Sequence, residues 1–231
     1  FESKAANLLH PNFGPWFFLG ELLITEELEP TAAPAPGSCG SCTACLDACP
    51  TDALISPGVL DSNRCISYQT IENRGPIPVE LHESIGEWVF GCDICSEVCP
   101  WGNDAPDLSE RFGLHDALKE RPLISWLEDP VPFKERYQGS PLQRPKRAGL
   151  ARNAAIVLGN RGGDKELGVL LRALSFDPDS LVREAAGHSL ARSYGDDIAT
   201  KSALEEAALQ EEDGRVAAEL RAARERCSGV D

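Results

Sequence analysis

The sequence contains no methionine, only four histidines and no long apolar run. A membrane-spanning helix needs about 20 consecutive apolar residues, and the apolar stretches here are interrupted, for example at Gly20 and at Gly159. The first residues also lack the pattern of a signal peptide. Because no initiator methionine is present, we expect that Phe1 is not the natural start and that a segment upstream is missing.

Common catalytic motifs are absent as well. The sequence has no Gly-x-Gly-x-x-Gly, P-loop or Gly-x-Ser-x-Gly pattern, and its histidines share no spacing that would indicate a metal site. It therefore offers no self-sufficient site for acid–base or covalent catalysis. The net charge of −15 argues against binding of nucleic acid through overall charge.

Cysteine is the residue type that stands out. Eight of the nine cysteines lie between Cys39 and Cys99, which in the absence of a signal peptide predicts thiolate ligands rather than disulfides. The first run is Cys39-x2-Cys42-x2-Cys45-x3-Cys49-Pro50, and the second is Cys92-x2-Cys95-x3-Cys99-Pro100. The second run lacks a leading cysteine, which Cys65 could supply.

This spacing predicts two [4Fe–4S] clusters. In two-cluster ferredoxins the fourth cysteine of a run binds the other cluster. We therefore assign Cys39, Cys42, Cys45 and Cys99 to cluster 1, and Cys49, Cys65, Cys92 and Cys95 to cluster 2. Two zinc sites would also use eight thiolates, but zinc favours separated Cys-x2-Cys pairs. Cys227 is expected to be a free thiol without a role.

The predicted fold class is α+β, with a ferredoxin-like domain for two [4Fe–4S] clusters followed by an α-helical HEAT-like repeat domain. The boundaries that we predict are residues 39–103 for the cluster domain, 104–147 for a connecting segment and 148–231 for the repeats. The repeats are indicated by Arg152-Asn153-Ala154-Ala155, which recurs as Arg183-Glu184-Ala185-Ala186 and, in degraded form, from Arg215. An ordinary helical bundle with accidental similarity is the alternative.

Local patterns give further expectations. Helices are predicted for residues 17–26 and 114–120, and two short helices after the cysteine loops, with Pro50 at the start of one. Residues 30–38 read as an extended Pro/Ala linker. Turns between helices are expected at residues 162–164 and 177–179.

A basic segment precedes and enters the first predicted repeat. Between residues 134 and 152 it contains one acid, Glu135, and six bases, which are Lys134, Arg136, Arg144, Lys146, Arg147 and Arg152. A segregated basic patch on an acidic protein predicts a docking surface for a polyanion. The alternative is a solvated loop and helix start.

Five segments of the sequence together resemble one known family. They are KAANLLHPNFGPWFFLGE, CGSCTACLDACPTDAL, RCISYQTIE, GCDICSEVCPWG and KRAGLARNAAIVLGN. The chain is similar through them to the epoxyqueuosine reductases, which are cobalamin- and iron–sulfur-dependent oxidoreductases of tRNA processing and queuosine biosynthesis.

The resemblance implies that epoxyqueuosine in a tRNA anticodon loop is reduced to queuosine, with the two clusters passing electrons to cobalamin. It implies that Ser67, Tyr68, Gly91 and Asp93 lie against the corrin. It further implies that the HEAT-like domain and nearby basic residues hold the tRNA, and there we expect Arg144, Lys146, Arg147 and Arg152.

Family members carry a large N-terminal domain that builds most of the cobalamin pocket and supplies the catalytic acid. Residues 1–38 would be the end of that domain and a linker, so the catalytic residue is unknown in this chain. A flavodoxin- or ferredoxin-like electron donor, a monomer and a cytoplasmic location are expected, without a membrane partner. A non-enzymatic two-cluster electron carrier with a helical protein-docking module is the alternative function.

Overall fold

The computed structural model describes residues 1–30, 37–107, 113, 122–128 and 132–227, and the chain divides into two compact units. Unit 1 comprises residues 1–65 and 93–113, and unit 2 comprises residues 66–92 and 114–231. The stretch 66–92, which lies within the cluster domain predicted from the sequence, is grouped with the helices of unit 2. The predicted domain boundaries stay a prediction.

Unit 1 is built from short elements. They are the helices α1 (Ala44–Asp47) and α3 (Ile94–Glu97), the strands β1 (Leu54–Ser56) and β2 (Val59–Leu60), and the 3-10 helix η2 (Pro100–Gly102). The strands form an antiparallel hairpin in which Leu54 pairs with Leu60. Gly58, at the turn, has a φ of +75°, a conformation that favours glycine. Helix α1 packs on both α3 and β1.

Two helix predictions in unit 1 are wrong. Residues 17–30 form neither helix nor strand, and the side chains of Phe18, Leu22 and Leu23 are more than nine-tenths exposed. A short helix is marginal in water unless it buries an apolar face, and this segment buries none. Pro50 begins a turn that leads into β1 instead of a helix. The helix predicted for 114–120 and most of the linker 30–38 lie outside the described residues.

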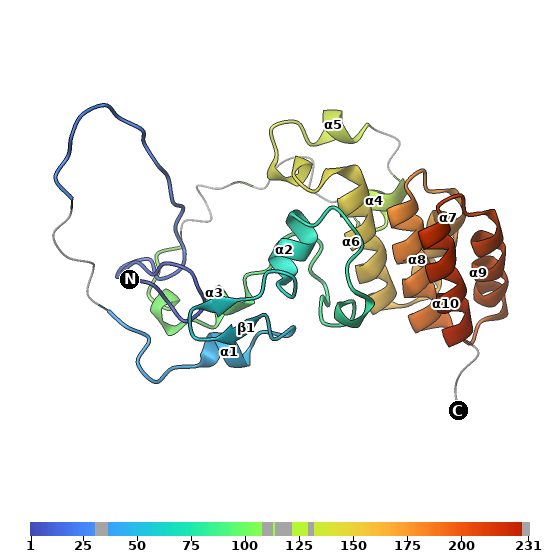
Figure 1. Cartoon of the computed structure of the whole chain (residues 1–231), viewed down its shortest axis with the longest axis horizontal. Coiled ribbons are helices and arrows are strands. Elements are labelled where there is room, and N and C mark those ends of the chain that lie inside the picture. The colour runs from blue at the N-terminus through green and yellow to red at the C-terminus, as the bar shows by residue number, and fades with distance from the viewer. Residues whose placement is uncertain (31–36, 108–112, 114–121, 129–131, 228–231) are drawn as a thin grey trace. The chain divides into compact units, whose positions relative to one another are not determined.

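Unit 2 begins with short elements and continues with five longer helices (Figure 1). The short elements are α2 (Ile66–Ile71), η1 (Val79–Leu81), α4 (Ser125–Glu128), α5 (Phe133–Arg136) and η5 (Pro141–Gln143). The longer helices are α6 (Lys146–Arg161), α7 (Asp164–Phe176), α8 (Ser180–Tyr194), α9 (Ile198–Gln210) and α10 (Gly214–Arg226). None of the helices among the described residues is long and apolar enough to cross a membrane.

The five longer helices stack as repeats. Helix α8 packs between α6 and α10 (Figure 1). In the chain, α7 connects α6 to α8, and α9 connects α8 to α10. Their contact is close because small residues lie at the crossings. A Cβ added at Gly159 of α6 would lie 2.5 Å from Cβ of Ser189 in α8. The recurring order of paired helices confirms the HEAT-like prediction and disfavours an unrelated bundle.

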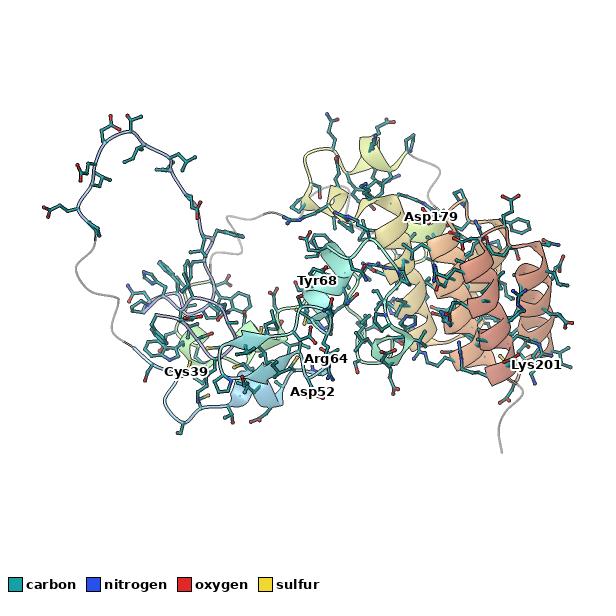
Figure 2. All side chains as sticks on the ribbon, viewed as in Figure 1. Cys39, Asp52, Arg64, Tyr68, Asp179 and Lys201 are labelled. Atoms are coloured by element: carbon teal, nitrogen blue, oxygen red, sulfur yellow. The ribbon has the colours of Figure 1, made fainter. Side chains whose placement is uncertain are left out.

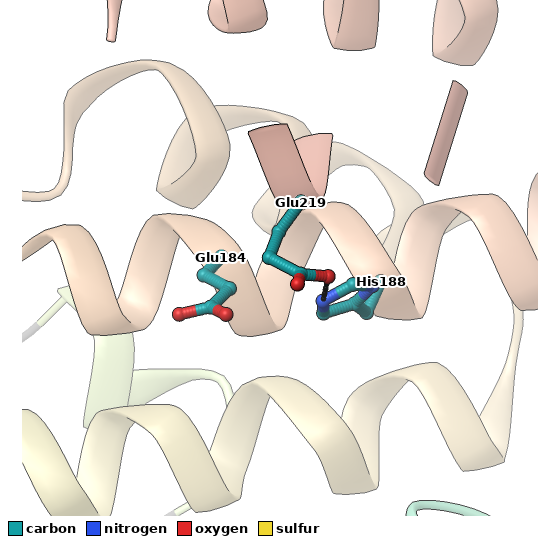
Figure 3. A group of neighbouring side chains, drawn as sticks. All are labelled: Glu184, His188 and Glu219. Atoms are coloured by element: carbon teal, nitrogen blue, oxygen red, sulfur yellow. Dashed lines mark ion pairs between the residues drawn. The ribbon is translucent and has the colours of Figure 1, made fainter. Parts of the chain in front are cut away.

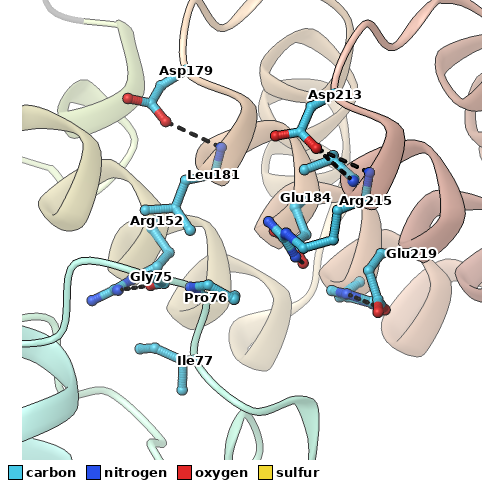
Figure 4. Close-up of polar contacts among 12 residues, drawn as sticks. Gly75, Pro76, Ile77, Arg152, Asp179, Leu181, Glu184, Asp213, Arg215 and Glu219 are labelled. Atoms are coloured by element: carbon cyan, nitrogen blue, oxygen red, sulfur yellow. Dashed lines mark hydrogen bonds and ion pairs between the residues drawn. The ribbon is translucent and has the colours of Figure 1, made fainter.

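The turns between these helices follow the predicted pattern. Gly162 and Gly163 have φ values of +68° and +114°, and they end α6 before Asp164 begins α7. Asp179 accepts a hydrogen bond from the backbone N–H of Leu181 at the start of α8 (Figure 4). Asp213 caps α10 in the same way. An aspartate at this position satisfies backbone donors that have no partner within the helix.

Candidate metal centre

Cysteines from both runs meet at one cavity in unit 1. It has a volume of about 240 Å³, and it is lined by the N-terminal segment, by both cysteine runs and by η2. Five cysteines line it, namely Cys39, Cys42, Cys45, Cys95 and Cys99. All four residues assigned to cluster 1 are among them. All nine cysteines lie in the described residues, and they are thiols rather than disulfides.

The two cysteine runs fold alike. In the first, residues 44–47 form α1 and the N–H of Cys49 bonds to the carbonyl of Leu46 (3.4 Å). In the second, residues 94–97 form α3 and the N–H of Cys99 bonds to the carbonyl of Ser96 (3.2 Å). Every cysteine of the second run therefore occupies the place of a cysteine 50 positions earlier. Two-cluster ferredoxins have paired runs of this kind, and the exchange of the last cysteine between the clusters stays a prediction.

The electrostatics of Cys45 also join the two runs. Burial raises the pKa of the Cys45 thiol, and backbone hydrogen bonds of Cys45 and Leu46 oppose this rise. The negative charges of Cys39 and Cys99 then raise the pKa further. Cys99, although 54 positions away, is thus close enough to Cys45 for their charges to interact. A metal centre would relieve this repulsion, because its iron ions neutralise the thiolates.

Cys49 has a different environment. Burial alone would raise its pKa, but hydrogen bonds from Thr51, Ala53 and Leu54 outweigh burial and lower the pKa. The N–H of Ala53 donates to Sγ of Cys49 over 3.3 Å. Hydrogen bonds to a sulfur stabilise the thiolate, which is the ligand form for a metal. Cys49 and Cys65 lie in unit 1 and Cys92 ends the stretch 66–92 of unit 2, so the four-residue set of cluster 2 stays a prediction.

The N-terminal segment of unit 1 packs on η2. A Cβ added at Gly14, whose φ is +55°, would lie 2.4 Å from the carbonyl oxygen of Trp101. The rings of Phe1 and Trp101 meet edge to face with centroids 4.9 Å apart. Lys4 of the same segment donates to the carbonyls of Gly40 (2.7 Å) and Cys42 (2.8 Å). Sequence reasoning missed Lys4, because a lone lysine forms no motif.

The residues expected at a corrin are divided between the units. Ser67 and Tyr68 lie on α2 in unit 2, where Tyr68 is 38% exposed (Figure 2). The backbone N–H of Gly91, also in unit 2, donates to Oγ1 of Thr70 on the same helix (3.0 Å). Asp93 belongs to unit 1 and immediately precedes α3. Three of the four residues therefore lie on α2 or are hydrogen-bonded to it, namely Ser67, Tyr68 and Gly91.

Of the four basic residues expected to bind tRNA, three already have partners within the protein, namely Arg144, Arg147 and Arg152. Nε of Arg144 lies 2.6 Å from a carboxylate oxygen of Glu72. Arg147 forms a bidentate salt bridge with the buried Asp177. Lys146 is exposed and begins α6 with a φ of +63°.

Arg152 is the fourth, and its placement corrects the prediction. Its side chain is fully buried, and it donates to the backbone carbonyls of Gln69 (2.6 Å), Asn73 (3.0 Å) and Gly75 (Figure 4). Burial lowers its pKa to about 10, with the nearby charge of Arg74 as a smaller cause. A guanidinium enclosed in this way has no donors left at the surface for an RNA phosphate. Arg152 instead fixes the stretch 66–92 to α6.

A group of titratable side chains in the helical stack resembles a metal site at first sight. Glu184, His188 and Glu219 bring one ligand atom each to within 4.8 Å of one another (Figure 3). However, both oxygens of Glu184 accept from Arg215 (2.6 and 2.7 Å). Arg226 donates to Nδ1 of His188 (2.8 Å), so the other ring nitrogen faces Glu219 with its proton. The group is an ion-pair network that holds α8 to α10.

Comparisons with known proteins agree with both halves of the structure. Residues 38–102 match a family described as a 4Fe-4S double cluster binding domain, and residues 142–224 match HEAT repeats. An epoxyqueuosine reductase of Xanthomonas campestris is 41% identical over 194 residues, which is 82% of this chain and 54% of that protein. One from Pseudomonas aeruginosa is 42% identical over 82% of this chain and 53% of its own length.

Solved structures show the same likeness. The epoxyqueuosine reductase of Bacillus subtilis superposes with a TM-score of 0.82 at 30% identity, over 98% of this chain and 60% of its own. An epoxyqueuosine reductase with a tRNA-Tyr epoxyqueuosine-modified stem loop gives 0.80 at 27% identity, over 99% and 60%. The chain thus spans between half and three-fifths of the length of these relatives.

Proposed function

The chain belongs to the epoxyqueuosine reductase family, and we propose that it carries the iron–sulfur and helical-repeat part of an enzyme that reduces epoxyqueuosine in a tRNA anticodon loop to queuosine. The observation that carries this proposal is the cavity of unit 1, where cysteines of two distant runs meet within the stretch that matches a double-cluster domain. The relatives described above are reductases, which favours this function over a non-enzymatic electron carrier.

The donor set of the cavity suits an iron–sulfur cluster. Cys39, Cys42, Cys45 and Cys99 offer four sulfur ligands, as a [4Fe–4S] cluster requires. Gly40 lies between Cys39 and Cys42 with a φ of +52°, a conformation that favours glycine and lets the ligand loop turn there. We assign the second cluster to Cys49, Cys65, Cys92 and Cys95. The hydrogen bonds around Cys49 favour its thiolate form.

Cobalamin is the second proposed cofactor. We propose that Ser67, Tyr68, Gly91 and Asp93 contact it, because the exposed ring of Tyr68 provides a flat apolar surface. Gly91 has a φ of +76°, and only Cδ1 of Ile71 lies within 4 Å of an added Cβ, so the backbone there is accessible. When bound, cobalamin would supply the chemistry that removes the epoxide oxygen. No described residue is assigned as the catalytic acid.

The proposed RNA contact is the surface around Arg144, Lys146 and Arg147. Lys146 is exposed, and the pairs made by Arg144 and Arg147 leave part of each guanidinium open, with side-chain exposures of 65% and 33%. Phosphate contacts of this kind position an RNA without reading its sequence. A flavodoxin- or ferredoxin-like protein is the proposed electron donor, and the proposed setting is a cytoplasmic monomer.

The test uses anaerobic protein reconstituted with iron and sulfide. We expect about eight irons and about eight sulfides per chain, as two four-iron clusters require, and retention of an epoxyqueuosine-modified tRNA-Tyr stem loop on the protein at low salt. Stoichiometric zinc in place of iron, or clusters without any affinity for the stem loop, would contradict the proposal.

A further inference from the structure

Both the side chain and the backbone of Lys4 are hydrogen-bonded within unit 1. Its ammonium donates to the carbonyl oxygens of Gly40 (2.7 Å) and Cys42 (2.8 Å), and its own carbonyl accepts from the N–H of Gly58 at the β1–β2 turn (2.9 Å). The side chain also lines the cavity that the cysteines share. A positive charge is therefore held against the loop that carries Cys39 and Cys42.

This charge is not cancelled by a neighbour. Among the described residues of unit 1 the strong bases are Lys4 and Arg64. Arg64 pairs with Asp52 (3.7 Å) and donates to the carbonyl of Thr51 (2.8 Å). Within the described part of the chain, Lys4 forms no ion pair with a carboxylate, and both of its acceptors belong to the ligand loop.

A fixed cation beside a cluster changes its redox equilibrium. A [4Fe–4S] cluster with four thiolates is anionic, and it becomes more negative when it takes up one electron. A nearby positive charge stabilises the reduced form more than the oxidised one, because the interaction energy grows with the charge. Charge and hydrogen bonding around the ligands are among the factors that set cluster potentials.

We propose that Lys4 is a positioning residue that raises the reduction potential of the cluster held by Cys39, Cys42, Cys45 and Cys99. The proposal rests on the proposed function, since it needs a cluster in this cavity. The step is a one-electron uptake from a low-potential donor such as dithionite. The cluster is reduced, the donor is oxidised, and no bond to the protein forms or breaks.

The experiment is a redox titration of the reconstituted chain with dithionite, followed by electron paramagnetic resonance. Lys4→Gln keeps a hydrogen-bond donor and removes the charge, so the equilibrium constant for reduction of one cluster should fall about tenfold, which is 59 mV for one electron. The other cluster should keep its potential. Lys4→Arg, which keeps the charge, and Lys165→Gln, an equal charge change on the exposed face of α7, should match the unaltered protein.

Iron content separates this inference from the function on which it rests. Chains without iron would contradict the proposed function, whereas full iron with unchanged potentials in Lys4→Gln would overturn the role of Lys4. Equal shifts of both clusters would also overturn it. If Lys4→Gln fails to hold iron, Ser41→Asp is compared with Ser41→Asn at the exposed loop position between Gly40 and Cys42. The aspartate adds a negative charge to the loop that holds Lys4, and it should lower one potential both directly and by offsetting the charge of Lys4. Equal potentials in these two variants would show that charge at this loop does not act on the cluster, and would overturn the proposal.

Discussion

Gly159 of α6 lies directly against Ser189 of α8, so that a Cβ on Gly159 would be 3.2 Å from the backbone Cα of Ser189 and closer still to its side chain. Gly159→Ala should therefore destabilise the helical unit by about 1–3 kcal/mol, as overpacking usually does. Ordinarily the same change stabilises a helix interior by up to about 1 kcal/mol. Urea unfolding followed by circular dichroism measures the difference.

Gly168 of α7 is the matched control. Only Nη1 of Arg172 lies within 4 Å of an added Cβ there, at 3.8 Å. Gly168→Ala should thus raise the free energy of unfolding by about 0.5–1 kcal/mol, in line with helix propensity. A stabilising effect of Gly159→Ala would show that the α6–α8 crossing is looser than described.

Removal of the Arg152 side chain should affect stability and leave RNA binding of the folded protein unchanged. Arg152→Met would leave the carbonyls of Gln69, Asn73 and Gly75, which are buried or partly buried, without this donor. Charged hydrogen bonds contribute about 1.5–3 kcal/mol each, so a loss of at least about 3 kcal/mol is expected. If this variant lost stem-loop affinity at full stability, the assignment of Arg152 to the interior would be wrong.

The RNA surface is better tested through Arg144 and Lys146. The double variant Arg144→Ala and Lys146→Ala should weaken stem-loop binding and reduce the log–log salt dependence by roughly one unit per lost phosphate contact. Lys165→Ala and Lys201→Ala together provide the same charge change elsewhere on unit 2. Arg147 is left intact in this experiment, because its removal would leave the buried carboxylate of Asp177 without this charged partner and would destabilise the protein. Equal slopes for both double variants would remove this surface from the proposal.

Iron content tests the ligand assignment. Cys45→Ser and Cys99→Ser should each damage the same cluster and leave the signal of the other, since their charges interact across the two runs. Cys65→Ser should damage the other cluster. Cys227→Ser is the control, because that thiol is buried against Ala191 and Ala223 in the helical stack. Different clusters lost in Cys45→Ser and Cys99→Ser would refute the exchange of ligands.

A pH dependence is expected from His82. Burial lowers its pKa from 6.5 to about 4, despite the hydrogen bond to Ile77, and the charges of His188, Arg192 and Arg152 act in the same direction as burial. The unfolded chain binds the proton first as the pH falls, so stability present above pH 6.5 is lost toward pH 4, by about 1.4 kcal/mol per pH unit. Urea unfolding at several pH values should show that His82→Gln loses less stability between pH 7 and 5.5 than the unaltered protein.

The α+β class, the double-cluster domain and the HEAT-like repeats could be predicted because their signals are local. Cysteine spacing and a recurring Arg-x-Ala-Ala pattern are visible within short windows of the chain. The role of Arg152 could not be predicted. Its repeat counterpart Arg183 pairs with the buried side chain of Glu211 at the end of α9, whereas Arg152 donates to carbonyls about 80 positions earlier. The helix predicted for residues 17–26 is absent for a similar reason. A short apolar segment is stable as a helix only where its apolar face packs against another part of the protein.

The cavity of the cysteines has a consequence for the order in which the chain matures. Its lining comes from residues near 3–7, 39–45 and 95–101, so it cannot close before the chain has been synthesised as far as about residue 101. The stack α6–α10 needs only neighbouring helices, and contacts of short range form fast. The helical unit can thus be complete while the thiols of unit 1 still await iron. Cluster insertion would then be a step of its own, separate from the folding of the helical unit.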